Sequence, residues 1–365
     1  MRHARKHPSG RGFQRLSVEK LEDRSLMAGN VTAAVTGGVL NITGDTADNG
    51  ITVDYTLATN SYTVTGTAQG GSATTINGLD TSVPANVQTF TNVTKGIRVL
   101  ANNGNDNLVF GAAASTNFTV AGFVDIQMGN GNDTVSIGRN GNAAGGAAPI
   151  ANKFEVGTTM AIKLGFGNDT LDITNTKVAR DLIIHADVNN PINNASDGND
   201  TIRFPTTFTQ NNNPVQTFPV TVGKKSTVLL GGGVDIFNAA NLHARGGLFV
   251  QDLSSALTFD LIDSQIGGEL KIQKTGGGAT DVDIDNVQAG TLRATLGGGV
   301  DTVDIRDSIF ERMYLDTGAS VDDITIANTR VRKAGLISGG RDKARLTQEA
   351  GNQLRGVVKS KVFTP

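Results

Sequence analysis

The chain has 365 residues, a formal net charge of −2 and no cysteine, which excludes disulfides and cysteine-based catalysis or metal binding. Its 28 Asp far outnumber its 6 Glu and it contains 46 Gly, a composition that favours turns over helices. Residues 25–329 carry 16 basic and 29 acidic side chains, a net charge of −13 that favours cations and argues against nucleic acid as a partner. No apolar run reaches the roughly 18 residues of a membrane-spanning helix.

Residues 1–29 form a leader segment that begins with basic residues but lacks the apolar stretch of a secretory signal peptide. On physical grounds alone we expect a basic tail that is disordered or marginally helical. The stretch VEKLEDRSLMAG resembles the L-E-x-R motif near the start of many large exported proteins of planctomycete bacteria. Leu21, Glu22, Arg24 and Leu26 carry this resemblance, and Met27 stands where a second Leu is usual. The resemblance implies export or sorting to the cell surface, and thus an extracellular location.

Residues 30–101 alternate apolar and polar side chains in short runs, such as GVLNITG from Gly38 and NGITVDYTL from Asn49. Runs of period two that are bounded by Asn, Gly and Asp predict β-strands. We expect this region to form the first, irregular coils of a repeat array together with an N-terminal cap, because solenoids require their ends to be covered.

From residue 102 to residue 340 a short unit recurs, in which a glycine turn precedes an Asp and an alternating apolar run. Examples are GNGNDTVSI from Gly129, GFGNDTLDI from Gly165 and GGGVDTVDI from Gly297. Such a unit cannot bury its own apolar face, so copies must stack. The sequence therefore predicts an all-β fold, a right-handed parallel β-helix (solenoid) with N- and C-terminal caps. The basic residues 341–365 are expected to form the C-terminal cap, as a short helix or a final irregular strand.

The spacing of the repeats predicts which side chains become vertical neighbours. The apolar residues two positions after the repeat Asp are Leu108, Val135, Leu171, Ile202 and Phe237, at steps of 27, 36, 31 and 35 residues, and Phe259, Val282, Val303 and Ile324 follow at steps of 22, 23, 21 and 21. Val282, Val303 and Ile324 are expected to form one inward column. The uneven early steps indicate loops near Asn140, Asn189 and Pro205 that leave the helix at a corner. Further inner walls are expected from Ile284, Ile305 and Ile326, from Leu292 and Met313, and from Ala294, Leu315 and Leu336. A corner row of hydrogen-bonding side chains is expected from Asn286, Asp307 and Asn328.

The glycine turns resemble the RTX, or haemolysin-type, nonapeptide, whose turns bind calcium through an Asp carboxylate and backbone carbonyls. This resemblance implies a row of calcium sites at Asp106, Asp133, Asp169, Asp200, Asp235 and Asp301. The chain departs from the RTX pattern because one copy occurs per coil rather than one every nine residues, so at most one edge of the helix would hold ions. The alternative is turn chemistry alone, in which Gly and Asn supply positive φ and Asp accepts backbone N–H groups.

The main alternative function is a carbohydrate-active β-helix enzyme, either a polysaccharide lyase or a glycoside hydrolase. Its best candidates are Asp283 and Asp304, expected one coil apart on an outer face with Asp285, Arg306 and Asp263 nearby, because such chemistry uses clustered carboxylates. Alternating Asp is also the ordinary outer face of an acidic strand. The four His are scattered along the chain and predict no metal cluster or catalytic triad.

The sequence as a whole predicts an exported or cell-surface structural or adhesive β-solenoid that calcium stabilises through its Gly-Asn-Asp turns. Expected partners are calcium ions and an extracellular polysaccharide or protein. No nucleic acid, transmembrane segment, catalytic residue or organic cofactor is assigned.

Overall fold

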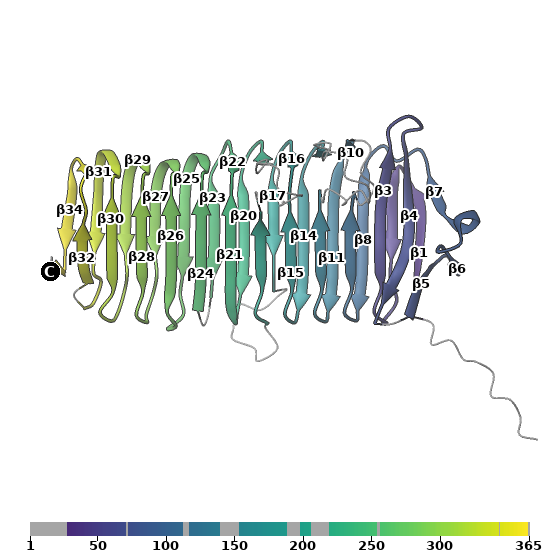
Figure 1. Ribbon diagram of the computed structural model, residues 1–365, viewed down its shortest axis with the longest axis horizontal. Coiled ribbons are helices and arrows are strands. Elements are labelled where there is room, and N and C mark those ends of the chain that lie inside the picture. Colours follow the sequence, from purple (N-terminus) through teal and green to yellow (C-terminus); the bar gives the residue numbers. More distant parts are fainter. Residues whose placement is uncertain are drawn as a thin grey trace, which may run out of the picture.

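The computed structural model describes residues 28–363, apart from residues 71, 112–116, 139–152, 188–197, 206–218, 254–255 and 343. The predicted leader motif and most of the predicted corner loops lie outside the described residues. The described chain is a long stack of β-strands that run across the long axis of the molecule (Figure 1). One 3₁₀ turn, Pro84–Asn86, is the only helical element among these residues.

The stack is a parallel β-solenoid whose coils contribute strands to three faces, numbered here in the order in which the chain runs through a coil. Face 1 contains β2 (Val39–Thr43), β8 (Gly96–Asn103), β11 (Phe123–Asn130), β14 (Met160–Phe166), β17 (Leu182–His185), β20 (Ser226–Gly231), β23 (Leu248–Asp252), β25 (Gln265–Lys274), β27 (Gln288–Thr295), β29 (Ile309–Asp316), β31 (Arg330–Ser338) and β34 (Val357–Ser360).

Face 2 contains β3 (Gly50–Thr56), β9 (Asn107–Phe110), β12 (Thr134–Ile137), β15 (Thr170–Ile173), β18 (Thr201–Phe204), β21 (Val234–Ala240), β24 (Ala256–Ile262), β26 (Thr280–Asp285), β28 (Thr302–Arg306), β30 (Asp323–Ala327), β32 (Ala344–Gln348) and β35 (Val362–Phe363). Face 3 contains β10 (Phe118–Val120), β13 (Phe154–Val156), β16 (Thr176–Val178), β19 (Val220–Val222), β22 (Leu242–Ala244) and β33 (Gln353–Leu354). In β25, β27, β29 and β31 the strand of face 3 continues into face 1.

Most strand pairs at the N-terminal end of the stack are antiparallel. β1 (Ala28–Thr36) pairs with β2, and β4 (Ser61–Gln69) pairs with β3 and β7 (Gln88–Phe90). β5 (Ser72–Ile76) pairs in parallel with β1 and antiparallel with β4 and with β6 (Leu79–Asp80). Because β2 and β3 pair in parallel with β8 and β9, these antiparallel strands lie directly against the first regular coil.

The predicted inward column of Val282, Val303 and Ile324 is confirmed, and it extends through the earlier copies of the repeat on face 2. Leu108 pairs with Val135, and the pairing continues through each member of the series to Ile324. Ile51 precedes the column and Leu346 follows it. All of these side chains are buried, so one apolar file runs through the solenoid.

Other predicted walls are confirmed with one exception. Leu292 pairs with Met313, and Ala294 pairs with Leu315. The prediction that Leu336 continues this wall is wrong, because β31 shifts its register against β29 by one residue. Leu315 therefore pairs with Ile337, whereas Leu336 moves to the outer surface and is 38% exposed.

The predicted polar corner row is confirmed for the hydrogen bond between Asn328 and Asp307, and Asn286 bonds to Asp263 in the coil before it. Asn328 donates from Nδ2 to Asp307 Oδ1, and Asn286 donates from Nδ2 to Asp263 Oδ1 at 2.6 Å. These residues have φ between 44° and 52°, a conformation that Asn and Asp tolerate better than most residues. The corner after face 2 is therefore made by single left-handed residues.

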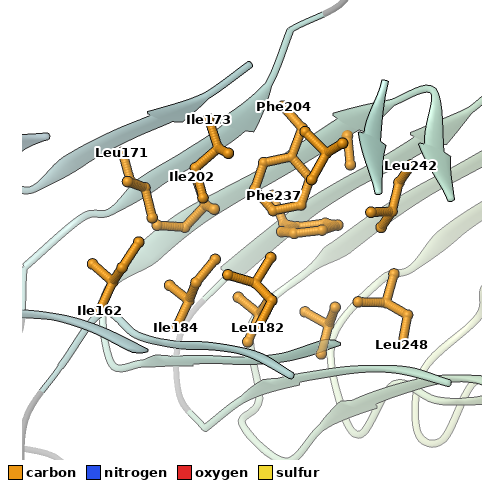
Figure 2. Packing of buried hydrophobic residues seen from close by; sticks show 14 of the residues in the cluster. Ile162, Leu171, Ile173, Leu182, Ile184, Ile202, Phe204, Phe237, Leu242 and Leu248 are labelled. Atoms are coloured by element: carbon orange, nitrogen blue, oxygen red, sulfur yellow. The ribbon is translucent and has the colours of Figure 1, made fainter. Parts of the chain in front are cut away.

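The core is the narrow interior between the faces. Figure 2 shows Ile162 and Ile184 of face 1 opposite Leu171 and Ile202 of face 2. In the middle of the stack, the rings of Phe237 and Phe259 are stacked with centroids 5.3 Å apart. Each coil thus buries its apolar side chains against the next coil as well as across the interior.

The C-terminal segment continues the stack. β32 and β34 pair with β30 and β31, and β35 pairs with β32. Of the two forms expected for this segment, helix or strand, the described residues 344–363 adopt strands.

Candidate functional site

The six Asp that the sequence singled out occupy one position of the coil, directly before a strand of face 2 or at its start. Hydrogen bonds between coils place them in a vertical row with Asp322, and each is at most 1% exposed. We call these residues the aspartate row: Asp106, Asp133, Asp169, Asp200, Asp235, Asp301 and Asp322. The row is interrupted between Asp235 and Asp301, where Leu257 and Thr280 occupy the same position.

Each carboxyl in the row accepts a backbone hydrogen bond from the preceding coil. Asp133 Oδ1 accepts the N–H of Asp106 at 2.8 Å, and Asp169 Oδ1 accepts the N–H of Asp133 at 2.7 Å. Asp200 and Asp235 continue the pattern at 2.8 Å. The Asp side chain therefore accepts a hydrogen bond from a buried backbone N–H at a turn, in place of the backbone carbonyl that would accept it within a strand.

A second row lies one residue earlier and runs in the opposite direction. Asn105 Oδ1 accepts the N–H of Asn132 at 2.8 Å, and Asn132 Oδ1 accepts the N–H of Asn168 at 2.8 Å. Asn168 and Asn199 repeat the arrangement, and the last donor is the N–H of Val234 at 2.7 Å. In a Gly-Asn-Asp turn, Asn thus accepts from the next coil and Asp from the previous one.

The glycine of the motif is required by close stacking of the turns. Gly131 has φ of 140°, and a Cβ atom at this residue would lie 1.8 Å from the carbonyl oxygen of Gly104 in the coil before it. Gly167 repeats this geometry against Gly131, at 2.0 Å. Any side chain here would push the coils apart and break both polar rows.

The second carboxyl oxygen of most row members is buried and has no hydrogen-bond partner among the described residues. These atoms are Oδ2 of Asp106, Asp133, Asp169, Asp235, Asp301 and Asp322. Burial raises the pKa to about 6 for Asp133, to about 7 for Asp106 and Asp301, to about 8 for Asp169 and to about 9 for Asp235. A buried carboxylate whose second oxygen has no partner is costly, so these carboxyls favour a proton or a cation.

The interruption of the row contains a buried lysine that lies outside the repeat motif. Lys274 is 1% exposed, and its Nζ donates to the carbonyl oxygen of Gly278 at 2.9 Å. Burial lowers the pKa of Lys274, and the carboxylates of Asp252 and Asp301 oppose that shift. The alternating pattern of β25 could have indicated that this lysine is buried, because Lys274 lies on the same side of the strand as Leu270 and Ile272, which both point inward.

The fit of calcium to the row depends on the ligands that each turn offers. Calcium takes about six to eight oxygen ligands. Across the described residues there is no group of three or more His, Cys, Asp or Glu side chains that could hold a metal ion. A calcium ion at the row would therefore combine a carboxyl Oδ2, such as that of Asp169, with backbone carbonyls and water.

The alternative catalytic candidates, Asp283 and Asp304, are direct neighbours in adjacent coils, as expected, and Asp260 precedes them in the same column. Burial, followed by the charge of Asp304, raises the pKa of Asp283. Asp304 forms an ion pair with Arg306 at 2.8 Å, and Arg306 also contacts Glu349 at 3.2 Å. This column lies on the outer surface of face 2, on the opposite side of the strands from the apolar column.

Comparisons with protein-family models, with curated proteins and with solved structures found no match. In the part of the chain that the structure describes, no helix is long and apolar enough to span a membrane.

Proposed function

We propose that this protein is an exported or cell-surface module with a structural or adhesive role, built as a right-handed parallel β-helix with a cap at each end. The observation that carries the proposal is the unbroken column from Ile51 to Leu346, which makes most of the described chain a single rod. A rod of stacked coils offers a long lateral surface on which one chemical feature can repeat at each coil. The antiparallel pairs that β1, β4, β5, β6 and β7 form at the N-terminal end of the stack support the N-terminal cap.

Export is supported by the resemblance of the leader to the planctomycete sorting motif. Antibody labelling and protease accessibility on intact producing cells would test it. We expect the protein to be labelled and cleaved on unbroken cells. Recovery only from the cytoplasmic fraction would overturn the proposal.

We further propose that calcium stabilises the rod at the aspartate row. The buried Oδ2 atoms of residues such as Asp106 and Asp169 support this, because a cation would neutralise carboxyls that otherwise require protons. An ion that binds only the folded form raises the melting temperature, by an amount equivalent to about 2.7 kcal/mol at a concentration of 100 Kd.

Calorimetry near pH 8 in EDTA, in magnesium and in millimolar calcium tests this role. We expect calcium alone to raise the melting temperature, and Asp169→Asn to reduce the increase. The matched control is Asp283→Asn, which removes an outer carboxyl and should leave the calcium response unchanged. Identical melting in EDTA and in calcium would show that calcium does not stabilise the folded chain and would overturn this role.

A further inference from the structure

A groove of about 580 Å³ crosses the outer surface from β19 to β31, where face 3 bends into face 1. One file of lining side chains follows the parallel register at one residue per coil: Thr221, His243, Gln265, Gln288 and Ile309. The groove is therefore a linear site along the axis of the solenoid. Its volume lies within the range of about 300–1,000 Å³ that is typical of ligand sites.

The groove is hollow because the middle of its second file lacks side chains. This file begins with Arg245, continues through Gly267 and Gly290, and ends with Glu311 and Arg332. A Cβ atom at Gly267 would lie 2.2 Å from the carbonyl oxygen of Arg245, so the close stacking of coils requires glycine there. The bend of the chain thus produces a depression with an arginine at each end.

The charge of the groove is opposite to that of residues 25–329 as a whole. The one lining carboxylate, Glu311, contacts Arg332 at 2.9 Å and Lys333 at 2.9 Å, and these contacts lower its pKa. Arg245 is exposed and forms no ion pair with the other described residues. The groove therefore retains net positive charge on a protein whose central part carries −13.

The length and chemistry of the groove point to an extended ligand. Arg245 and Arg332 are four coils apart, or about 19 Å at roughly 4.8 Å per coil. Between them, the exposed amides of Gln265 and Gln288 can each donate to and accept from a hydroxyl group. Arginine matches the planar geometry of carboxylate and binds other oxyanions, so a ligand with hydroxyls between two anionic groups would satisfy both the glutamines and the arginines of the groove.

We propose that this groove binds a linear anionic polysaccharide. The proposal deepens the adhesive role proposed above and rests on it, because it names the class of surface that the rod would contact. Single-stranded nucleic acid fits less well, because no Phe, Tyr or Trp side chain lines the groove to stack on bases.

Binding of the full chain to polygalacturonate, to heparin and to neutral dextran, measured by calorimetry at low and high salt, tests the proposal. The first two probes separate carboxylate from sulfate as the anionic group. We expect salt-sensitive binding to at least one of them and none to dextran. The double variant Gln265→Glu/Gln288→Glu preserves shape but adds negative charge, and should weaken binding at least tenfold.

The matched control is Gln273→Glu, which makes the same change in β25 but outside the groove, and should bind like the unmodified protein. Melting curves would confirm that all variants are folded. The proposal is overturned if neither anionic polymer binds, if dextran or poly(dT) binds as tightly, or if the double variant retains full affinity. These outcomes would leave the cell-surface location unaffected, whereas a cytoplasmic location would remove the adhesive role without changing the binding measurement.

Discussion

The coils before Phe237 and those after it make the turn that precedes face 2 with different polar groups. Before it, Gly-Asn-Asp turns build two polar rows, and successive coils take 27 to 36 residues. After it, coils take 21 to 23 residues, and Leu257 and Thr280 replace Asp in the row. The N–H of Leu257 donates instead to the carbonyl oxygen of Ala279, at 3.2 Å.

This difference shows that the interactions that hold the coils in register are not the ones that satisfy the backbone hydrogen-bonding groups of the turns. The apolar column and the parallel ladders run through both regions without a break. The aspartate row stops and resumes, so stacking does not depend on it. The buried N–H group at this position of the coil can therefore donate either to a carboxyl oxygen or to a backbone carbonyl oxygen. Only the carboxyl brings charge into the interior.

The largest effect on stability is expected from deprotonating the carboxyls of the aspartate row. Because burial raises the pKa of these carboxyls above the unfolded value of 3.8, to about 6 for Asp133 and about 9 for Asp235, the folded chain holds protons that the unfolded chain has released. The stability that these bound protons contribute is complete below the pKa of the unfolded chain and is lost as the pH rises through the pKa values of the folded chain. The melting temperature in EDTA should fall between about pH 5 and pH 9. Asp169→Asn/Asp235→Asn should flatten this slope, and an unmodified protein whose melting temperature is constant over this range would contradict the assignment.

Removing the ring of Phe237, which lies at the boundary between the two regions, tests whether they share one core. Phe237→Ala should lower the free energy of unfolding by about 3–5 kcal/mol, because it leaves a cavity between Phe204 and Phe259. Denaturant unfolding measures the loss, and hydrogen exchange should report weaker protection on both sides of the cavity. Val300→Ala, at a side chain that is 63% exposed, is the control and should change stability by less than about 0.5 kcal/mol. Loss of protection on one side only would mean that the regions are separate cooperative units.

A single row substitution tests the role of the carboxyl in the first region. Asp169→Ala should destabilise the protein by about 1–3 kcal/mol, because the buried N–H of Asp133 loses its acceptor. Asp169→Asn keeps an acceptor oxygen and should cost less at acidic pH. Chemical denaturation at about pH 5 compares the two variants, and equal losses would show that the hydrogen bond to Asp133 is not what the side chain contributes.

The smallest expected effect would rebuild a polar row in the second region. Val300 is stacked before Val321 at the position that Asn occupies in earlier turns, and both side chains are exposed. Val300→Asn should stabilise the protein by about 0.5–1.5 kcal/mol, because the new amide oxygen would accept the N–H of Val321. Thermal melting compares it with Val300→Gln, whose longer side chain places the amide beyond this donor. Equal stability of the two variants would show that the asparagine row depends on the flanking glycine geometry.

The column of face 2 was predictable from the sequence because period-two alternation after a recurring turn leaves few possible registers. Leu336 was misplaced because a one-residue shift inside β31 carries no local sequence signal and reverses the face of every later side chain. The groove could not be predicted, because residues such as His243 and Arg332 are far apart in the chain and become neighbours only through stacking.

The sequence by itself determined that this chain stacks short β-units, which residues point inward, and that a carboxyl recurs at one turn. These are local properties of alternation and turn chemistry. The tertiary structure decided that the carboxyls are buried, which backbone donors they satisfy, and which outer side chains form a common surface. Burial and the direction of a hydrogen bond depend on the neighbouring coil, whose distance along the chain varies from turn to turn.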